Sequence, residues 1–108
     1  MLPLSPATLH ILLALAAGDL HGYGIMQAVS RESGGSYKLG PGTLYDNLQR
    51  LLDQGLVEEA GQQARRRCYR LSSQGTQVLA NEIRRLESVV RDGRLRLGLG
   101  GGPREGVD

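Results

Sequence analysis

The chain has 108 residues, a length typical of one domain, and its thirteen basic side chains exceed its eleven acidic ones by only two. So small an excess neither requires nor excludes an acidic partner. Cys68 is the only cysteine, which excludes an intramolecular disulfide and a metal site built from several cysteines. The apolar run at 11–17 is too short to span a membrane and follows no basic residue, so we expect a cytoplasmic protein without a membrane partner.

A first helix is predicted from Ser5 to about Ala17, because Ser5 can cap free backbone N–H groups and Pro6 suits the first helical position. Helical spacing relates the apolar residues Leu9, Leu12, Leu13 and Ala16. Ile11 and Leu15 make the opposite side apolar as well, so this helix is expected to be buried on two sides. Either a second subunit or the same chain can cover the side that holds Ile11 and Leu15, and the periodicity leaves both alternatives open.

Two further helices are predicted before residue 56. The segment 20–33 has apolar residues at helical spacing and is followed by two glycines that can end a helix. The next helix begins at Gly40 and Pro41, ends at Gly55 and is amphipathic. Its apolar stripe consists of Leu44, Leu48, Leu51 and Leu52. Its polar stripe consists of Gly42, Thr43, Asp46, Gln49 and Arg50.

A strand, a turn and a returning strand are predicted at residues 56–60, 61–66 and 67–71. Two antiparallel strands joined in this way would form a β wing beside the preceding helix. Three consecutive arginines, Arg65, Arg66 and Arg67, lie at the predicted tip, and the short stretch that also includes Arg70 contains no acid. The tip is therefore expected to carry a local positive patch.

A last helix is predicted over residues 72–97, with Ser72 as its cap. Its apolar residues Leu79, Ile83, Leu86 and Val90 are four, three and four positions apart, which is the spacing of a two-stranded helical seam. Two heptads are too short to be stable alone, so this helix is expected to lie either on its own domain or on a second copy of the chain, and we favour the second copy. The glycine-rich tail, residues 98–108, is expected to be disordered. The predicted dimer interface comprises Ile11, Leu15, Leu79, Ile83, Leu86 and Val90.

These elements predict a mainly α fold with a small two-stranded antiparallel β wing. Residues 1–71 would form a winged helix-turn-helix domain, and residues 72–97 a C-terminal dimerisation helix. Together, the motifs LHGY (20–23), PGTLY (41–45), QGLVEE (54–59) and RRRCYRLSSQG (65–75) resemble the PadR-like transcriptional regulators, in the compact subgroup with a single C-terminal helix. Gly24, Gly40 and Asp46 depart from the glutamate, serine and proline that this family often has at these positions.

The resemblance implies a winged-helix homodimer that represses transcription by binding a pseudo-palindromic operator in double-stranded DNA. In some family members a small, often aromatic, molecule enters a pocket near the dimer interface and releases the DNA. This chain has no Trp or Phe and no aromatic residue in the predicted last helix. We therefore expect a small hydrophobic effector of aliphatic character, or none.

DNA contacts are also expected on physical grounds. Small residues at the start of the third helix allow close approach to the major groove, where Thr43 and Gln49 can reach base edges. Asp46 would repel phosphate but can accept a hydrogen bond from a cytosine amino group. The arginines of the wing suit phosphates or the minor groove. The predicted DNA contacts are Tyr23, Lys38, Gly42, Thr43, Tyr45, Asp46, Gln49, Arg50, Arg65, Arg66 and Arg67.

Eight of these residues also have a purely structural interpretation, because the three arginines at 65–67 can be only a solubilising turn. Gly42 can be a tolerated helix-start glycine, Tyr23 and Tyr45 can pack on the core, and Lys38 and Arg50 can be solvated charges. A rival function uses the same arginines to bind an acidic protein surface without any DNA. A third alternative is an RNA-binding module, although no sheet with exposed aromatic residues favours single-stranded RNA.

Catalytic chemistry finds little support in the sequence. His10 lies in an apolar helix and His21 at the start of a helix, and no second histidine stands at a metal-binding spacing. There is no glycine-flanked nucleophilic serine and no phosphate-binding loop. We therefore expect neither an enzyme nor a cofactor or metal site, and assign no role to Cys68.

Overall fold

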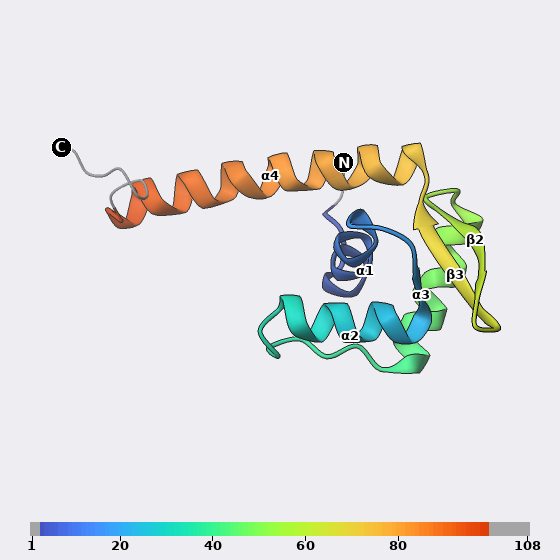
Figure 1. Cartoon of the computed structure of the whole chain (residues 1–108). Coiled ribbons are helices and arrows are strands. Elements are labelled where there is room, and N and C mark those ends of the chain that lie inside the picture. Colours follow the sequence, from blue (N-terminus) through green and yellow to red (C-terminus); the bar gives the residue numbers. More distant parts are fainter. Residues whose placement is uncertain (1–2, 100–108) are drawn as a thin grey trace.

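A computed structural model describes residues 3–99, which form four helices and three strands. In chain order these are α1 (Pro6–Ala16), β1 (Leu20–His21), α2 (Gly22–Glu32), α3 (Pro41–Asp53), β2 (Val57–Gln63), β3 (Arg66–Leu71) and α4 (Ser73–Leu97). Helix α1 lies between α4 and α2, and the sheet closes one end of the molecule beside α3 (Figure 1). One surface of α3 therefore lies beside the hairpin that β2 and β3 form.

Polar side chains cap three of the helices. The Ser5 hydroxyl accepts from the Thr8 N–H at the start of α1, and the Ser72 hydroxyl accepts from the Gly75 N–H at the start of α4. These two caps confirm the sequence prediction. His21 caps α2 through its ring Nδ1, which accepts from the Gly24 N–H at 3.0 Å. Three orphan amide groups are thereby satisfied within the chain.

The sheet has three strands in the order β1-β3-β2, so the prediction of a two-stranded wing was wrong. Leu20 pairs with Tyr69 and His21 with Cys68, both antiparallel. The apolar spacing predicts instead that the segment containing β1 belongs to the second helix. Two residues are too few to show a strand periodicity, and β1 exists only because the folded chain brings it to the free edge of β3.

The core surrounds α1. Ile11 has no exposed surface and Leu15 is 3% exposed, because the chain's own helices and sheet cover both side chains. Of the two alternatives left open for this helix, packing within one chain is the one observed. Leu79 in the first half of α4 is also covered, at 7% exposed. A second subunit therefore has almost no part of these three side chains to contact.

Helix α4 packs on the body of the molecule only along its first half. Gly75 lies so close to the Leu56 carbonyl that a Cβ at position 75 would overlap it. Two turns further, the Glu82 carboxylate is buried and accepts from the Leu4 N–H at 3.2 Å and from the Arg85 guanidinium at 2.8 Å. The second half projects beyond α1 and α2 (Figure 1).

Gly98 ends α4 in the left-handed conformation, with φ 68°, and the Leu99 N–H donates to the Arg94 carbonyl. The predicted tail is described only at residues 98 and 99, and its remaining residues lie outside the described part of the chain. Within residues 3–99, no helix combines the length and the apolar character that a membrane crossing requires.

Candidate nucleic-acid interface

Helix α3 is amphipathic as predicted. Leu44, Leu48 and Leu51 are buried, whereas the five residues of the predicted polar stripe are exposed. The helix begins with Gly40 as its N-cap, which makes no side-chain hydrogen bond, and Pro41, which has no N–H. Apart from its chain neighbours and the backbone of its own helix, no heavy atom of the described residues lies within 4 Å of a Cβ built at Gly42. Packing inside the chain therefore does not require glycine there.

Asn47 is a buried polar residue in the apolar stripe of α3, and sequence analysis missed it. Its Oδ1 accepts from the Thr8 hydroxyl of α1 at 3.0 Å and from the Arg50 Nη2 at 3.2 Å, and its Nδ2 donates to the Thr43 carbonyl at 2.8 Å. These bonds tie the start of α3 to α1 and orient the Arg50 guanidinium. The sequence did contain a signal for this buried amide. Asn47 lies one turn from Leu44 and from Leu51, so it occupies a position of the stripe where an apolar residue is expected.

Gln49 and Asp46, two residues of the exposed stripe, differ in the hydrogen bonds that their side chains make within the described residues. The Gln49 side-chain amide donates to the Asp53 carboxylate at 3.0 Å, which leaves the Gln49 carbonyl oxygen as an acceptor. Asp46 is exposed and makes no side-chain hydrogen bond or ion pair with the described residues. Both side chains lie on the face that would meet a base edge.

Strands β2 and β3 form a hairpin that is longer than predicted, because both strands continue to a two-residue turn. Ala64 and Arg65 occupy this turn with φ values of 51° and 66°. Positive φ at both central positions matches the right-handed twist of a hairpin, although neither residue is glycine. A register shift between Glu59 and Gln62 bends the hairpin before its tip. Arg65 is consequently held at the end of the wing.

The arginines of the wing differ in their neighbours. Arg67 pairs with Glu59 at 3.6 Å and Arg70 with Asp19 at 3.4 Å, so the fold supplies acids that the local sequence does not. The Arg66 guanidinium lies over the Tyr23 ring, 5.8 Å from its centroid. Arg65 makes no ion pair with any described residue. The positive charge at the tip is thus least compensated at Arg65 and Arg66.

A cleft of about 390 Å³ joins the wing to the helices. It is lined by residues 21–23 at the start of α2, Tyr45 of α3, and Gln62, Arg65, Arg66, Arg67 and Tyr69 of the hairpin. These lining residues include three arginines and no carboxylate. Burial raises the pKa of the Tyr69 phenol, while the nearby Arg67 charge acts against this rise.

Tyr23 and Tyr45 are 54% and 49% exposed, so neither is a core residue. Both rings border the cleft, and their position favours the contact role over core packing.

The family model described as the transcriptional regulator PadR-like family matches residues 11–81 of this chain.

The chain belongs to the PadR-like family. The members of this family are DNA-binding transcriptional regulators rather than enzymes. The matched segment runs from α1 into α4 and includes the amphipathic helix, the cleft and the complete hairpin.

The chain is also similar to individual proteins. The chain is 38% identical to the transcriptional regulator Rv3488 of Mycobacterium tuberculosis, over 78% of each protein. It is 41% identical to a 37.1 kDa protein in transposon TN4556 of Streptomyces fradiae, over 70% of this chain but only 21% of that protein. The structure of Bacillus subtilis PadR in complex with operator DNA aligns with a TM-score of 0.61 and 26% identity, over 70% of this chain and 45% of that one.

The PadR-like fold brings together only part of the predicted contact set. Tyr23, Tyr45 and the three arginines at the tip meet at the cleft, whereas Lys38 lies in the segment between α2 and α3. Tyr37, next to Lys38, stacks on His10 of α1 with ring centroids 4.8 Å apart. This stack attaches the segment that leads into α3 to the core.

Proposed function

We propose that this chain is a homodimeric transcriptional repressor that binds an inverted-repeat operator. Helix α3 enters the major groove, and the β2–β3 wing contacts the adjacent backbone. The observation that carries the proposal is the cleft in which Tyr45 of α3 meets Arg65 and Arg66 of the wing without any lining carboxylate. A surface of this kind attracts phosphate at the place where a reading helix and a wing would both meet one duplex.

Within this proposal the exposed stripe of α3 reads sequence. Thr43, Asp46 and Gln49 face base edges, and Gly42 lets the helix approach closely. Arg50, oriented by Asn47, and Lys38 contact phosphates on either side of the helix. The repressor acts in the cytoplasm, where it meets its operator.

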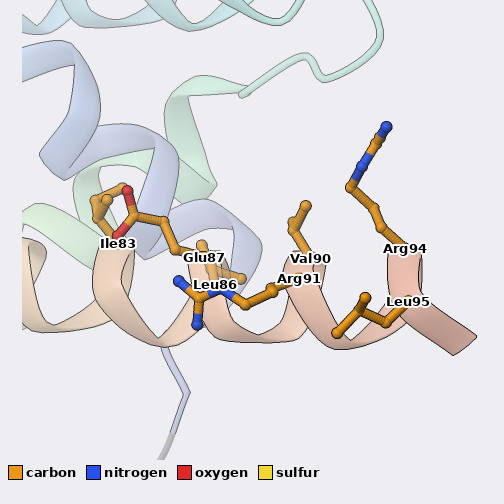
Figure 2. A pocket seen from close by; sticks show the side chains of 7 residues that line it. All are labelled: Ile83, Leu86, Glu87, Val90, Arg91, Arg94 and Leu95. Carbon is orange, nitrogen blue, oxygen red and sulfur yellow. The ribbon is translucent and has the colours of Figure 1, made fainter. Parts of the chain in front are cut away.

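The second half of α4 joins two copies in this proposal. Ile83, Leu86, Val90 and Leu95 line a groove of about 420 Å³ together with Glu87, Arg91 and Arg94 (Figure 2). Val90 is 56% exposed and Leu95 69% exposed, so the described residues leave more than half of each side chain uncovered. Glu87 on one copy can pair with an arginine on the other, which favours a symmetric partner.

This groove is also where we place any small effector. Its apolar lining is aliphatic, so a bound molecule would be held by shape and burial rather than by stacking on a ring. A ligand bound between the two copies of α4 would shift these helices relative to each other. This shift would change the distance between the two copies of α3.

The test measures fluorescence anisotropy of the purified protein with duplex DNA from upstream of its own gene, beside a shuffled duplex, across a salt series. A preference for the upstream duplex that persists as salt rises would support the repressor. Changing all three arginines at 65–67 to glutamine should weaken binding and reduce the salt slope by up to about 2.7, since each lost phosphate contact contributes about 0.9. Unchanged DNA binding in this variant would contradict the role of the wing and favour the protein-binding alternative.

A further inference from the structure

The cleft brings together two side-chain nitrogen atoms, one of His21 and one of Arg66, that cannot form a hydrogen bond with each other. The His21 ring caps α2 by accepting from the Gly24 N–H at Nδ1. In a neutral imidazole the other nitrogen then carries the hydrogen, so Nε2 is a donor. Its neighbour at 3.4 Å is Nη1 of Arg66, and a guanidinium nitrogen is always a donor. The contact is therefore between two donors, and the described residues supply no acceptor that both could share.

The surroundings of this donor pair point to an anion. His21 and Arg66 both line the cleft, whose described lining contains no carboxylate that could accept from them. The Tyr23 ring lies 5.8 Å from the guanidinium, within cation–π distance, and favours this position of the arginine. His21 is fixed in turn by its bond to Gly24 and by the pairing of β1 with β3. Both donors are thus positioned before any ligand arrives.

We propose that His21 and Arg66 together bind one phosphate oxyanion, and that this phosphate belongs to the backbone of duplex DNA. This inference rests on the proposed function, because α3 and the wing would place the duplex backbone beside the cleft. His21 donates as a neutral ring through Nε2, and Arg66 supplies the charge. One oxyanion accepts from both nitrogens and removes the unfavourable contact between them.

The decisive variant is His21→Asn. An asparagine at this position keeps an acceptor for the Gly24 N–H, and asparagine is among the best N-cap residues, so the fold should be retained. It is too short to place a donor where Nε2 stands. We expect a thermal midpoint close to that of the wild type and duplex binding weakened by about tenfold. The salt slope should not change, because a neutral donor displaces no counterion.

Arg66→Gln is the partner variant and should lower the salt slope by about 0.9. Because both side chains serve one phosphate, the double variant should lose less affinity than the product of the two single losses. Arg70→Gln is the matched charge control, since Arg70 is a β3 arginine outside the cleft and pairs with Asp19. Independent effects of His21→Asn and Arg66→Gln would overturn a shared phosphate.

A second readout separates DNA phosphate from free phosphate. Inorganic phosphate is titrated into the DNA-free protein while the His21 ring signals are followed by NMR, with Arg66→Gln as the comparison. Weak binding that moves the His21 signals in the wild type alone agrees with the proposal. Tight binding of free phosphate, with duplex affinity unchanged in His21→Asn, would overturn the DNA assignment.

The two proposals fail in different ways. A wild-type protein that binds no duplex overturns the proposed function and the DNA source of the phosphate, and the NMR titration then decides whether an oxyanion site exists. If the wild type binds duplex DNA and His21→Asn binds it equally tightly, only the present inference is overturned. Failure of phosphate to move the His21 signals, together with an unaffected His21→Asn, overturns the site completely.

Discussion

Gly22, the first residue of α2, lies directly against the phenol of Tyr45 in α3. A Cβ at position 22 would overlap the Tyr45 hydroxyl and come within 2.8 Å of the ring carbon that bears it. The backbone of one helix thus sets the position of a half-exposed ring on the next. This ring borders the cleft that we propose as the meeting point of helix and wing.

Gly22→Ala should therefore move the Tyr45 ring without unfolding the protein. The ring is half exposed and can swing aside, so the change in unfolding free energy should stay below about 1 kcal/mol. Duplex affinity, measured by anisotropy, should fall because the phenol leaves the cleft. In a Tyr45→Ala background the same substitution should have no further effect. An equal loss in both backgrounds would show that Tyr45 does not mediate it.

Gly42→Ala tests whether the start of α3 approaches DNA closely. A Cβ there meets no described atom, so the folded state should be unchanged or more stable by up to about 1 kcal/mol. Duplex binding should nevertheless weaken by about tenfold, a loss similar to that from one spoiled base pair. Gly93→Ala, at an equally open helical glycine in α4, is the control and should leave duplex affinity unchanged. Full affinity in Gly42→Ala would favour the interpretation of Gly42 as a tolerated helix-start glycine.

Val90→Glu and Val89→Glu form a matched pair for the dimer. The two valines are 56% and 53% exposed, but only Val90 lines the groove on α4. A carboxylate at 90 would replace apolar surface in the proposed interface and lose its hydration there, which should raise the dimer dissociation constant by about 100-fold or more. Sedimentation equilibrium measures this constant directly. Equal dimerisation of both variants, or a monomeric wild type, would refute the proposed interface.

Glu82 should make stability depend on pH. Its carboxylate is 2% exposed, and the hydrogen bond from Arg85, with a further one from the Leu4 N–H, holds its pKa below the ordinary value of 4.5. A lowered pKa in the folded state means that the ionised group stabilises the fold at pH values above 4.5. This contribution is lost as the pH falls from there through the folded-state pKa.

The measurement is the urea midpoint of the wild type and of Glu82→Gln at pH 7 and at steps below pH 5. We expect Glu82→Gln to be less stable at pH 7 and to lose less stability in acid. Glu58→Gln, an exposed carboxylate on β2, should keep the acid dependence of the wild type. A parallel fall in all three proteins would show that Glu82 does not contribute to the acid dependence.

Local chemistry in the sequence was enough for much of this fold. The Ser5 and Ser72 caps and the apolar stripe of α3 were predicted correctly, and the hairpin was predicted with arginines at its tip but with strands that are too short. Each depends on residues a few positions apart, so the physical cause lies within one short segment. The motifs of those segments also identified the PadR-like family.

Only the tertiary structure decided which segments meet. Residues 20 and 21 became a strand because the edge of β3 was free, and Ile11 and Leu15 were buried by their own chain rather than by a partner. The bond from Thr8 to Asn47 spans 39 positions, and the contact of His21 with Arg66 spans 45. Hydrophobic periodicity shows that a face is buried but not what covers it, and donors far apart in sequence oppose each other only when the packed chain brings them together.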